Sequence, residues 1–440
     1  MEISSLFLNE LKISLGSDFD EFIKGKDEKC KKGIRLNLLK VNSEITQKLD
    51  FEIEKSPFCS EGYYILNENL GNHPLHHAGA FYIQEPSATS AVEILDIQKG
   101  DYVLDLCAAP GGKSTQIAAK LGGTGLIWSN EIVFKRANIL ISNFERMGVS
   151  NGIVSSQKPD VLCPVLKSCF DKVLVDAPCS GEGMIRKDNS IIKDWTKENV
   201  LACAVRQEKI LDVAADCVRD GGILVYSTCT FAREENEKNV KIFLEKHPEF
   251  SIIPSNVEFG RQGYEGLKET RRILWQDGGE GHFVAKFKKA GDSPRKELRY
   301  KGKIENDYKL FEDLGLELPV GLLIRGGDKL YLAPDIDIDK KLGVLRAGIY
   351  LGEYAKNRFI PSHCLYANPF VKAKNTLNLE LGDKRIADFL HGEEIWADSV
   401  EKGYCRVSIE GIPCSFGKFD GQKLKNHYPK GLRTLKKDCN

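Results

Sequence analysis

Short apolar runs alternate with longer segments of helical periodicity between residue 86 and about residue 245. The short runs are rich in β-branched residues, and the longer segments repeat apolar residues every three or four positions. This alternation predicts βαβ units around a parallel sheet. The predicted strands are YVLDLCA (102–108), GLIWSNE (125–131), GIVSS (152–156), KVLVDA (172–177), ILVYSTC (223–229) and HFVAKFKK (282–289).

Three segments between these strands have the spacing of helices, namely KSTQIAAKL (113–121), FKRANILISNFERMG (134–148) and ENVLACAVRQEKILDVAADCVRD (198–220). The third helix is predicted to end at Gly221 and Gly222, because glycine is favoured just past a helix C-terminus.

The remaining regions have other patterns. Residues 1–80 alternate short apolar pieces with polar connections, which suggests a small separate module. A polar stretch with Gly and Pro at 289–307 is typical of a linker, and strand-like runs with turns follow it. We therefore expect four parts, residues 1–85, 86–290, 291–365 (linker and first C-terminal subdomain) and 366–440.

Composition limits the class of protein. The 440 residues carry 63 Lys plus Arg and 63 Asp plus Glu, so the chain is not a globally basic nucleic-acid binder. No run approaches the roughly 20 apolar residues that cross a bilayer, and the start lacks a signal-peptide pattern, so an untargeted soluble protein is expected. The 13 cysteines include no CxxC pair, which favours a reducing cytoplasm over a disulfide framework or a zinc site.

A small-residue loop follows the first predicted strand of the sheet. In DLCAAPGGKSTQIA (105–118), Gly111 and Gly112 let the backbone approach a ligand at a helix N-terminus. The loop is neither GxGxxG nor GxxxxGKS. Glu131 ends the next predicted strand, where an acid accepts hydrogen bonds from a ribose diol. The alternatives are that the loop is an ordinary βα turn that binds no ligand and that Glu131 ends its strand by chance.

Two cysteines stand at the ends of two further predicted strands. FDKVLVDAPCSGEGMIRKD delivers Asp176 and Cys179, and ILVYSTCTF delivers Thr228 and Cys229. The carboxyl ends of parallel strands share one edge of a sheet, so these side chains are expected to face one crevice. Either cysteine alone is more often a small buried hydrophobe.

CAAPGGK, DAPCSGEG and YSTCTF, in this order and spacing, resemble the signature motifs of the Sun-type RNA cytosine-5 methyltransferases, which use S-adenosylmethionine. GIRLNLLK (33–40), FYIQEPSA (81–88) and EGHFVAKFKK (280–289) resemble other segments of that family. FGKFDGQKLKNHYPKGLR (416–433) resembles the C-terminal PUA-like module of the bacterial ribosomal RNA methyltransferase F subgroup. The resemblance implies an α/β, Rossmann-like methyltransferase core at 86–290, between an N-terminal RNA-binding-type α+β domain and a PUA-like RNA-binding domain at 366–440.

The resemblance also implies roles for single residues. Cys229 would be the nucleophile that adds to C6 of cytosine, and Cys179 would assist release of the methylated base. Cys179 is the second candidate nucleophile, because DNA cytosine methyltransferases attack with a Pro-Cys cysteine. Asp176 would hydrogen-bond the edge of the base. The implied cofactor-binding set is Cys107, Ala108, Ala109, Pro110, Gly111, Gly112, Lys113, Glu131 and Asp176.

Three positions remain open or unassigned. Lys113 has two candidate roles, pairing with the cofactor carboxylate or lowering the pKa of a nearby thiol. The family usually places an Asp or Asn near the adenine amine, and this chain offers Ser156, Gln157 or Lys158 there. HPLHH (73–77) has no Cys or acid at ligand spacing, so no metal is expected and a loop or surface role is favoured.

The expected partner is RNA, most simply small-subunit ribosomal RNA, and the expected state is a monomer. Residues 421–440 carry six Lys or Arg and one Asp, and Tyr428 and His427 lie among them. Such a segment suits phosphate contact and base stacking, with a frayed tail as the alternative. Competing functions are methylation of transfer RNA or DNA, and ribosome assembly by a non-catalytic RNA-binding factor.

Overall fold

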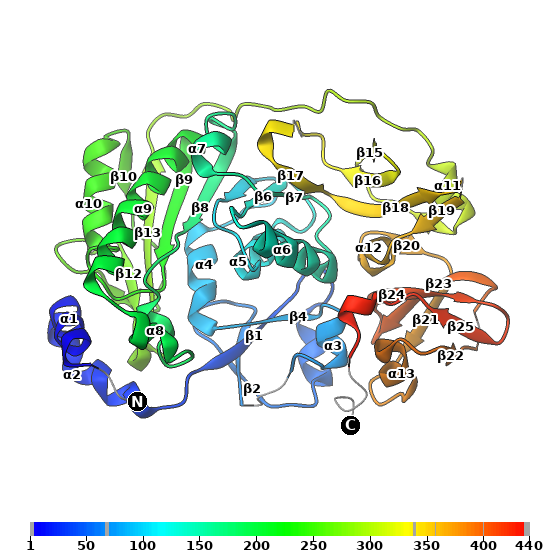
Figure 1. The fold of residues 1–440 in the computed structure, drawn as a ribbon, viewed down its shortest axis with the longest axis horizontal. Helices are drawn as coiled ribbons and strands as arrows, with labels where there is room; N and C mark the ends of the chain where they lie inside the picture. The colour runs from blue at the N-terminus through cyan, green and yellow to red at the C-terminus, as the bar shows by residue number, and fades with distance from the viewer. Residues whose placement is uncertain (1–3, 67–69, 338–339, 357, 399, 435–440) are drawn as a thin grey trace.

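A ten-stranded sheet forms the centre of the computed structural model, which describes residues 4–66, 70–337, 340–356, 358–398 and 400–434 (Figure 1). Its five parallel strands lie in the order β9-β8-β5-β6-β7. The strand order reverses beside β5, and open α/β sheets bind ligands at such a point. The bounds are β5 Tyr102–Asp105, β6 Leu126–Asn130, β7 Gly152–Ser155, β8 Phe170–Asp176 and β9 Val218–Thr228.

Antiparallel strands extend the sheet at both edges. β13 (His282–Lys289) pairs with β9, and β12 (Arg271–Ile273), β11 (Arg261–Gln262) and β10 (Phe250–Ile252) continue from it. At the other edge β17 (Val344–Ala347) pairs with β7. A strand that comes from beyond the predicted linker therefore completes the central sheet.

Helices cover both faces of the sheet, as the alternation of the sequence predicts. Val103 faces one hydrophobic cluster with helices α4 (Ser90–Leu95), α5 (Gly112–Leu121) and α6 (Phe134–Met147). Leu104 faces the other cluster with α7 (Pro159–Leu162), α9 (Lys197–Cys217) and α10 (Glu237–Lys246). The predicted Rossmann-like α/β class is confirmed.

The predicted end of the third helix is wrong. α9 ends at Cys217, and β9 begins at Val218, which pairs with Phe170 of β8. Gly221, with a φ of 76°, lies inside β9 rather than after a helix. Strand pairing at the start of β9 therefore outweighs the helix-ending signal of the two glycines.

The flanking regions form smaller sheets. β1 (Lys32–Leu36), β2 (Ile53–Lys55), β3 (Gly62–Ile65) and β4 (Phe81–Gln84) make an antiparallel sheet that packs with α3 (Pro74–His77). α1 (Ser5–Leu15) and α2 (Phe19–Phe22) pack instead in a hydrophobic cluster with Trp195 and Trp275. The chain between β13 and α11 (Lys309–Asp313) contains no helix or named strand among the described residues. Then follow β14 (Leu316–Glu317), β15 (Leu322–Gly326), β16 (Lys329–Ala333), β18 (Ile349–Ala355), β19 (Arg358–Pro361), α12 (His363–Ala367) and β20 (Lys372–Ala373).

The last sheet has the order β21-β23-β24-β25-β22. Its elements are β21 (Thr376–Leu379), α13 (Arg385–His391), β22 (Ile395–Trp396), β23 (Gly403–Ile409), β24 (Ile412–Phe419) and β25 (Lys423–Asn426). Figure 1 shows this sheet at the end of the molecule opposite α8 (Ser190–Asp194) and α10. The N-terminal sheet shares one hydrophobic cluster with it, through residues such as Leu36 and Phe81 on one side and Val407 on the other.

This contact corrects two expectations about the surface. His77 Nδ1 lies 2.8 Å from the hydroxyl of Tyr428, and burial lowers the pKa of His77 to about 4. Tyr428 is only 2% exposed, so it cannot stack on a base as predicted. The predicted loop or surface role of HPLHH is also wrong, because the segment forms α3 and packs between the N-terminal and C-terminal sheets.

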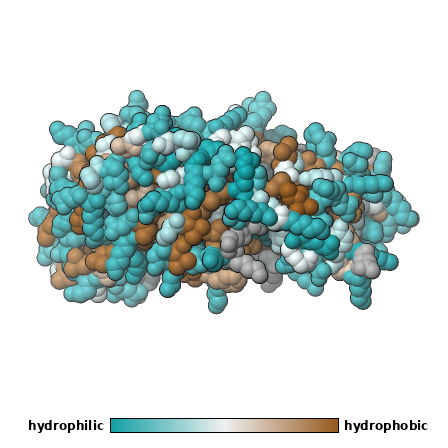
Figure 2. All heavy atoms as spheres, turned by 90° about the horizontal axis from the view of Figure 1, so that it is seen from above, coloured by the Kyte–Doolittle hydropathy of each residue, from teal (hydrophilic) through white to brown (hydrophobic). Residues whose placement is uncertain are grey.

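Polar side chains dominate the outer face drawn in Figure 2, where the apolar patches are scattered. Within the described ranges, no helix has the length and apolar character needed to cross a membrane.

A buried ion pair fixes the start of α10 to the edge of the sheet. Arg272 of β12 binds the carboxylate of Glu237 through Nε at 2.7 Å and Nη2 at 2.6 Å, and both side chains are at most 1% exposed. Arg272 Nη1 also donates to the carbonyl of Phe231 at 3.0 Å. Burial alone would raise the pKa of Glu237, but the charge and hydrogen bonds of Arg272 outweigh it and lower that pKa.

We predict that Arg272→Met destabilises the protein by about 3–5 kcal/mol, because it leaves the carboxylate of Glu237 buried without a cation. Arg271→Met is the control, since the Arg271 guanidinium donates to the backbone carbonyls of Lys268 and Thr270 rather than to a buried carboxylate. Thermal denaturation of both variants provides the comparison.

The extra stability of the wild type over Arg272→Met should be fully present above about pH 4.3, the ordinary pKa of glutamate. It should be lost as the pH falls through the lower pKa that Glu237 has in the folded protein. Equal melting temperatures for the two variants would contradict this account.

Candidate active site

The loops after β5, β6, β8 and β9 surround a pocket of about 890 Å³ at the carboxyl edge of the parallel strands. Six predicted site residues line it, namely Cys107, Ala109, Glu131, Asp176, Cys179 and Cys229. The other predicted residues belong to the loop and helix start behind this wall, namely Ala108, Pro110, Gly111, Gly112 and Lys113. The pocket thus brings the three sequence motifs together.

The glycine loop is held by α6. Gly111 has a φ of 113°, and a Cβ there would lie 2.9 Å from Cδ1 of the buried Leu140. Arg136 Nη2 donates to the carbonyl of Ala109 at 2.8 Å, and Asn143 Nδ2 donates to the carbonyl of Pro110 at 2.8 Å. Position 111 therefore requires glycine for two reasons, the positive φ and the close approach of Leu140 to the backbone.

Asp105 lies beneath this loop at the end of β5 and is fully buried. Its Oδ2 accepts a hydrogen bond from Ser114 at 2.6 Å, while its Oδ1 has no partner within the described residues. Burial raises the pKa of Asp105 to about 7. An unpaired buried oxygen is costly, and this one lies behind the pocket wall, since Asp105 is not among the residues that line the pocket.

Glu131 follows β6 directly and is 3% exposed. Its Oε1 accepts from the amide of Val133 at 2.9 Å, and its Oε2 lies 3.1 Å from Nη1 of Arg136. Its carboxylate is thereby fixed at the pocket wall beside the exposed apolar residues Ile132 and Val133. An acid next to an apolar surface suits a ribose attached to a flat base.

The two strand-end cysteines meet at the other side of the pocket. Cys179 Sγ and Cys229 Sγ are 3.2 Å apart, and both residues are free thiols of intermediate exposure. The amide of Cys229 also donates to Cys179 Sγ at 3.4 Å. The hydrogen bond with Cys229 and burial raise the pKa of Cys179 well above that of a free thiol. Cys179 is therefore held in its protonated thiol form.

Asp176 is the last residue of β8, and both of its oxygens are engaged. Ser227 Oγ donates to Oδ1 at 2.7 Å, and Lys113 Nζ donates to Oδ2 at 2.7 Å. Burial would lower the pKa of Lys113, but the charge and hydrogen bond of Asp176, together with the charge of Cys229, raise it. Lys113 therefore stays charged and orients Asp176. Neither of the two roles that the sequence suggested for Lys113 included Asp176 as its partner.

The structure narrows the candidates for the unassigned position. Lys158 lines the pocket with Pro159 and Asp160, whereas Ser156 and Gln157 do not. The amide of Ser156 donates to the carbonyl of Gly343 at 2.9 Å, in the segment that leads into β17. The local sequence shows only that a polar residue follows this strand, so it does not single out Asp160, which lies in the first turn of α7 and lines the pocket.

Two cations of α9 were also missed by the sequence patterns. Arg206 and Lys209 line the pocket from the helix between β8 and β9. Their spacing is ordinary for an exposed helix face, so the sequence carries no signal that distinguishes them.

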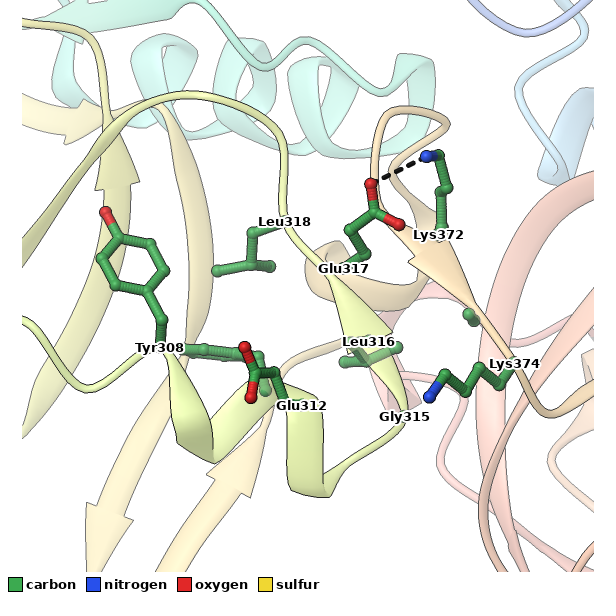
Figure 3. A pocket seen from close by; sticks show the side chains of 10 residues that line it. Tyr308, Glu312, Gly315, Leu316, Glu317, Leu318, Lys372 and Lys374 are labelled. Carbon is green, nitrogen blue, oxygen red and sulfur yellow. Dashed lines mark hydrogen bonds and ion pairs between the residues drawn. The ribbon is translucent and has the colours of Figure 1, made fainter.

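A second pocket, of about 520 Å³, lies between α11, β14 and β20 in the C-terminal half (Figure 3). In Figure 3, Lys372 reaches Glu317 across its rim, with Nζ and Oε1 2.7 Å apart. None of the predicted site residues lines this pocket.

Family models match nearly the whole chain. "16S rRNA methyltransferase RsmB/F" matches residues 92–288, and "N-terminal domain of 16S rRNA methyltransferase RsmF" matches 3–86. "RsmF rRNA methyltransferase first C-terminal domain" matches 309–367, and "Methyltransferase RsmF PUA domain" matches 376–434.

Curated proteins and solved structures agree with these models. "Ribosomal RNA small subunit methyltransferase F" of Shewanella oneidensis is 32% identical, over 98% of this chain and 97% of that protein. The protein of the same name from Vibrio vulnificus is 31% identical, over 97% and 96%. A "methyltransferase homolog protein" from Pyrococcus horikoshii is 28% identical, with a TM-score of 0.58 over 65% of this chain and 95% of that one. NSun6 of the same organism, solved with SFG, shares the fold at 22% identity and a TM-score of 0.60, over 66% and 99%.

We predict that Gly111→Ala destabilises the protein more than Gly100→Ala. Both glycines have positive φ, at 113° and 89°, and this backbone conformation alone costs about 1–2 kcal/mol for alanine. A Cβ at Gly100 meets nothing within 4 Å, whereas at Gly111 it meets Leu140. The difference between the melting temperatures of the two variants measures the effect of the contact with Leu140. Identical shifts in both variants would show that the loop has room for a side chain at position 111.

Proposed function

The chain belongs to the 16S rRNA methyltransferase RsmB/F family and is a methyltransferase, and we propose that it methylates C5 of cytosine in small-subunit ribosomal RNA. The observation that carries this proposal is the pair of cysteine sulfurs 3.2 Å apart beside Asp176, in one pocket. Action on ribosomal RNA also implies a cytoplasmic location, and a monomer is sufficient because one chain supplies every residue of the site.

The pocket fits S-adenosylmethionine as the methyl donor. The glycine loop, the fixed carboxylate of Glu131 and the apolar pair Ile132 and Val133 suit a methionine moiety, a ribose and an adenine. We assign Asp160 or Lys158 to the edge of the adenine. Bound S-adenosylmethionine supplies the methyl group, and NSun6 of Pyrococcus horikoshii was solved with SFG, an analogue of it.

The chain's own residues supply covalent catalysis. C5 of cytosine is a weak nucleophile, so the Cys229 thiolate adds to C6 and turns C5 into an enamine-like carbon. Asp176, oriented by Lys113 and Ser227, hydrogen-bonds the base edge as the ring accepts electrons. After methyl transfer, a base removes the C5 proton, the electron pair of the C5–H bond re-forms the C5–C6 double bond, and the S–C6 bond breaks to release the Cys229 thiolate. Cys179, in contact with Cys229, assists this release.

The C-terminal module supports RNA as the substrate, with contacts different from those the sequence suggested. Residues 423–426 form β25 of a folded sheet, so this part of the basic segment is not a frayed tail. Trp396 is 60% exposed, and Nζ of Lys423 lies 5.0 Å from its ring centroid. An exposed aromatic beside a lysine suits base stacking and phosphate contact, the role that Tyr428 cannot fill.

Transfer of labelled methyl groups from S-adenosylmethionine tests the substrate class. Small-subunit ribosomal RNA, transfer RNA and DNA are each incubated with the purified protein, and 5-methylcytosine is measured in the product. Labelling of ribosomal RNA supports the proposal, and labelling of transfer RNA or DNA alone would replace it. Absence of labelling with every nucleic acid would favour a non-catalytic assembly factor.

We predict that Cys229→Ala abolishes methylation while S-adenosylmethionine still binds, because the variant lacks the sulfur that adds to C6. Cys179→Ala should instead accumulate a covalent protein–RNA adduct, since release is impaired. Denaturing electrophoresis of each variant with RNA and cofactor distinguishes the two. An adduct formed by Cys229→Ala, with Cys179 as its sulfur, would reverse the assignment.

Glu131→Ala should weaken S-adenosylmethionine binding at least tenfold, because hydrogen bonds to a charged group contribute about 1.5–3 kcal/mol. Glu198→Ala is the control, since Glu198 is exposed at the start of α9 and does not line the pocket. Calorimetric titration gives both affinities. An unchanged affinity in Glu131→Ala would remove Glu131 from the cofactor site.

A further inference from the structure

Buried polar groups join the two loops that carry the cysteines. Ser180 Oγ lies 2.8 Å from Oγ1 of Thr230, so the residues next to Cys179 and Cys229 are bonded as well as the two sulfurs. The amide of Gly183 donates to the carbonyl of Cys229 at 2.8 Å. The two loops are therefore one bonded unit rather than independent turns.

The segment before α10 holds this unit from behind, and Asn236 fixes the Cys229 side. Thr228 Oγ1 donates to Asn236 Oδ1 at 2.6 Å, and Asn236 Nδ2 donates to the carbonyl of Thr230 at 2.9 Å. Asn236 thus forms hydrogen bonds with Thr228, before Cys229, and with Thr230, after it. The side chain is fully buried, so solvent does not compete for these bonds.

Glu235 fixes the Cys179 side in the same way. Its Oε2 accepts from the amide of Ser180 at 3.0 Å and from Nε2 of Gln207 at 2.7 Å. Gln207 Nε2 also donates to the carbonyl of Pro178 at 3.0 Å. Glu235 therefore holds Ser180 directly and Pro178 through Gln207, on the two sides of Cys179.

Glu235 and the neighbouring Glu182 differ in how completely their carboxylate oxygens are hydrogen-bonded. Glu235 is fully buried, and its Oε1 has no hydrogen-bond partner in the part of the chain that the structure describes. Glu182, the other carboxylate that faces these loops, is satisfied by Trp195 Nε1 at 2.8 Å, Thr230 Oγ1 at 2.9 Å and the amide of Phe231 at 3.0 Å. Above about pH 7, where the Glu235 carboxyl ionises, its charge is therefore poorly compensated beside Cys179.

We propose that Glu235 is a positioning residue that assigns the thiolate to Cys229, by holding the Cys179 loop and placing a carboxylate behind it. Cys179 then stays a thiol that donates its hydrogen bond to the Cys229 thiolate across the 3.2 Å contact. The inference rests on the proposed function in one respect, namely that Cys229 is the attacking sulfur.

The charges around the site agree with this division between the two sulfurs. The charge of Glu235 contributes to the raised pKa of Cys179, after the hydrogen bond with Cys229, burial and the charge of Cys229. Burial raises the pKa of Glu235 itself to about 7, and the charge of Glu182 adds to that effect. On the other side, the charged Lys113 interacts with Cys229. Above about pH 7 an anion therefore lies near Cys179, whereas a cation lies near Cys229.

Glu235→Gln tests the proposal, because the amide oxygen can still accept from Ser180 and Gln207 while the charge is lost. Glu234→Gln is the matched control, since Glu234 pairs with Lys197 and Lys238 instead. Each protein is treated with iodoacetamide, and peptide mass spectrometry follows alkylation of Cys179 and Cys229 as a function of pH. Methylation of ribosomal RNA is measured in parallel as kcat and KM.

In the wild type and in Glu234→Gln, Cys229 should be alkylated before Cys179. In Glu235→Gln, alkylation of Cys179 above about pH 7 should accelerate relative to Cys229, by about three- to fourfold for each unit by which the pKa of Cys179 falls, because the gain in thiolate fraction outweighs the loss of nucleophilicity. kcat should fall, while KM for RNA stays unchanged.

An unchanged alkylation ratio in Glu235→Gln would overturn the proposal, even with a reduced kcat, because the residue would then act only on structure. If Glu235→Gln does not fold, the wild-type order decides, and earlier alkylation of Cys179 overturns the proposal. A wild-type protein that alkylates as expected but methylates no RNA would refute the proposed function and leave the inference intact.

Discussion

The parallel pairing of β8 with β9 is the constraint on which the site depends. Its register sets Asp176 opposite Ser227, so the turns that follow bring Cys179 and Cys229 to one point. A slip of one residue would turn every side chain of a strand to the other face and separate the two sulfurs. The fully buried strand residues Val173, Leu174 and Val225 fix that register by packing against helices on both faces.

The buried polar groups behind the cysteines would cost free energy if they lacked hydrogen bonds, which explains why most of them are paired. Glu237 with Arg272, Glu182 with Trp195, and Asn236 with Thr228 place strong donors and acceptors together in a region without solvent. Buried groups of this kind are stable only when their hydrogen bonds are formed. The same bonds hold the two loops in the geometry that the chemistry needs, so stability and catalysis rest on one network.

The sequence predicts the parts of this molecule that depend on local pattern. Alternating strands and helices, the glycine loop, Glu131 and both strand-end cysteines follow from periodicity and motifs, and the structure places the side chains of Glu131, Cys179 and Cys229 around one pocket. Features that depend on distant contacts could not be predicted. β17 joins the sheet from beyond residue 340 and engages the segment near Ser156, and Tyr428 is buried because α3 lies against it. The role of Glu235 depends on Ser180, which is 55 positions away.

The central claim is that Cys229, with Cys179 as its thiol partner, forms the covalent bond to cytosine. Ribosomal RNA that contains 5-fluorocytosine tests it most directly, because fluorine at C5 cannot leave as a proton does and the covalent intermediate is trapped. With S-adenosylmethionine present, peptide mass spectrometry should find the RNA nucleotide attached to the peptide of Cys229. Attachment to Cys179, or methylation without any trapped adduct, would contradict the account.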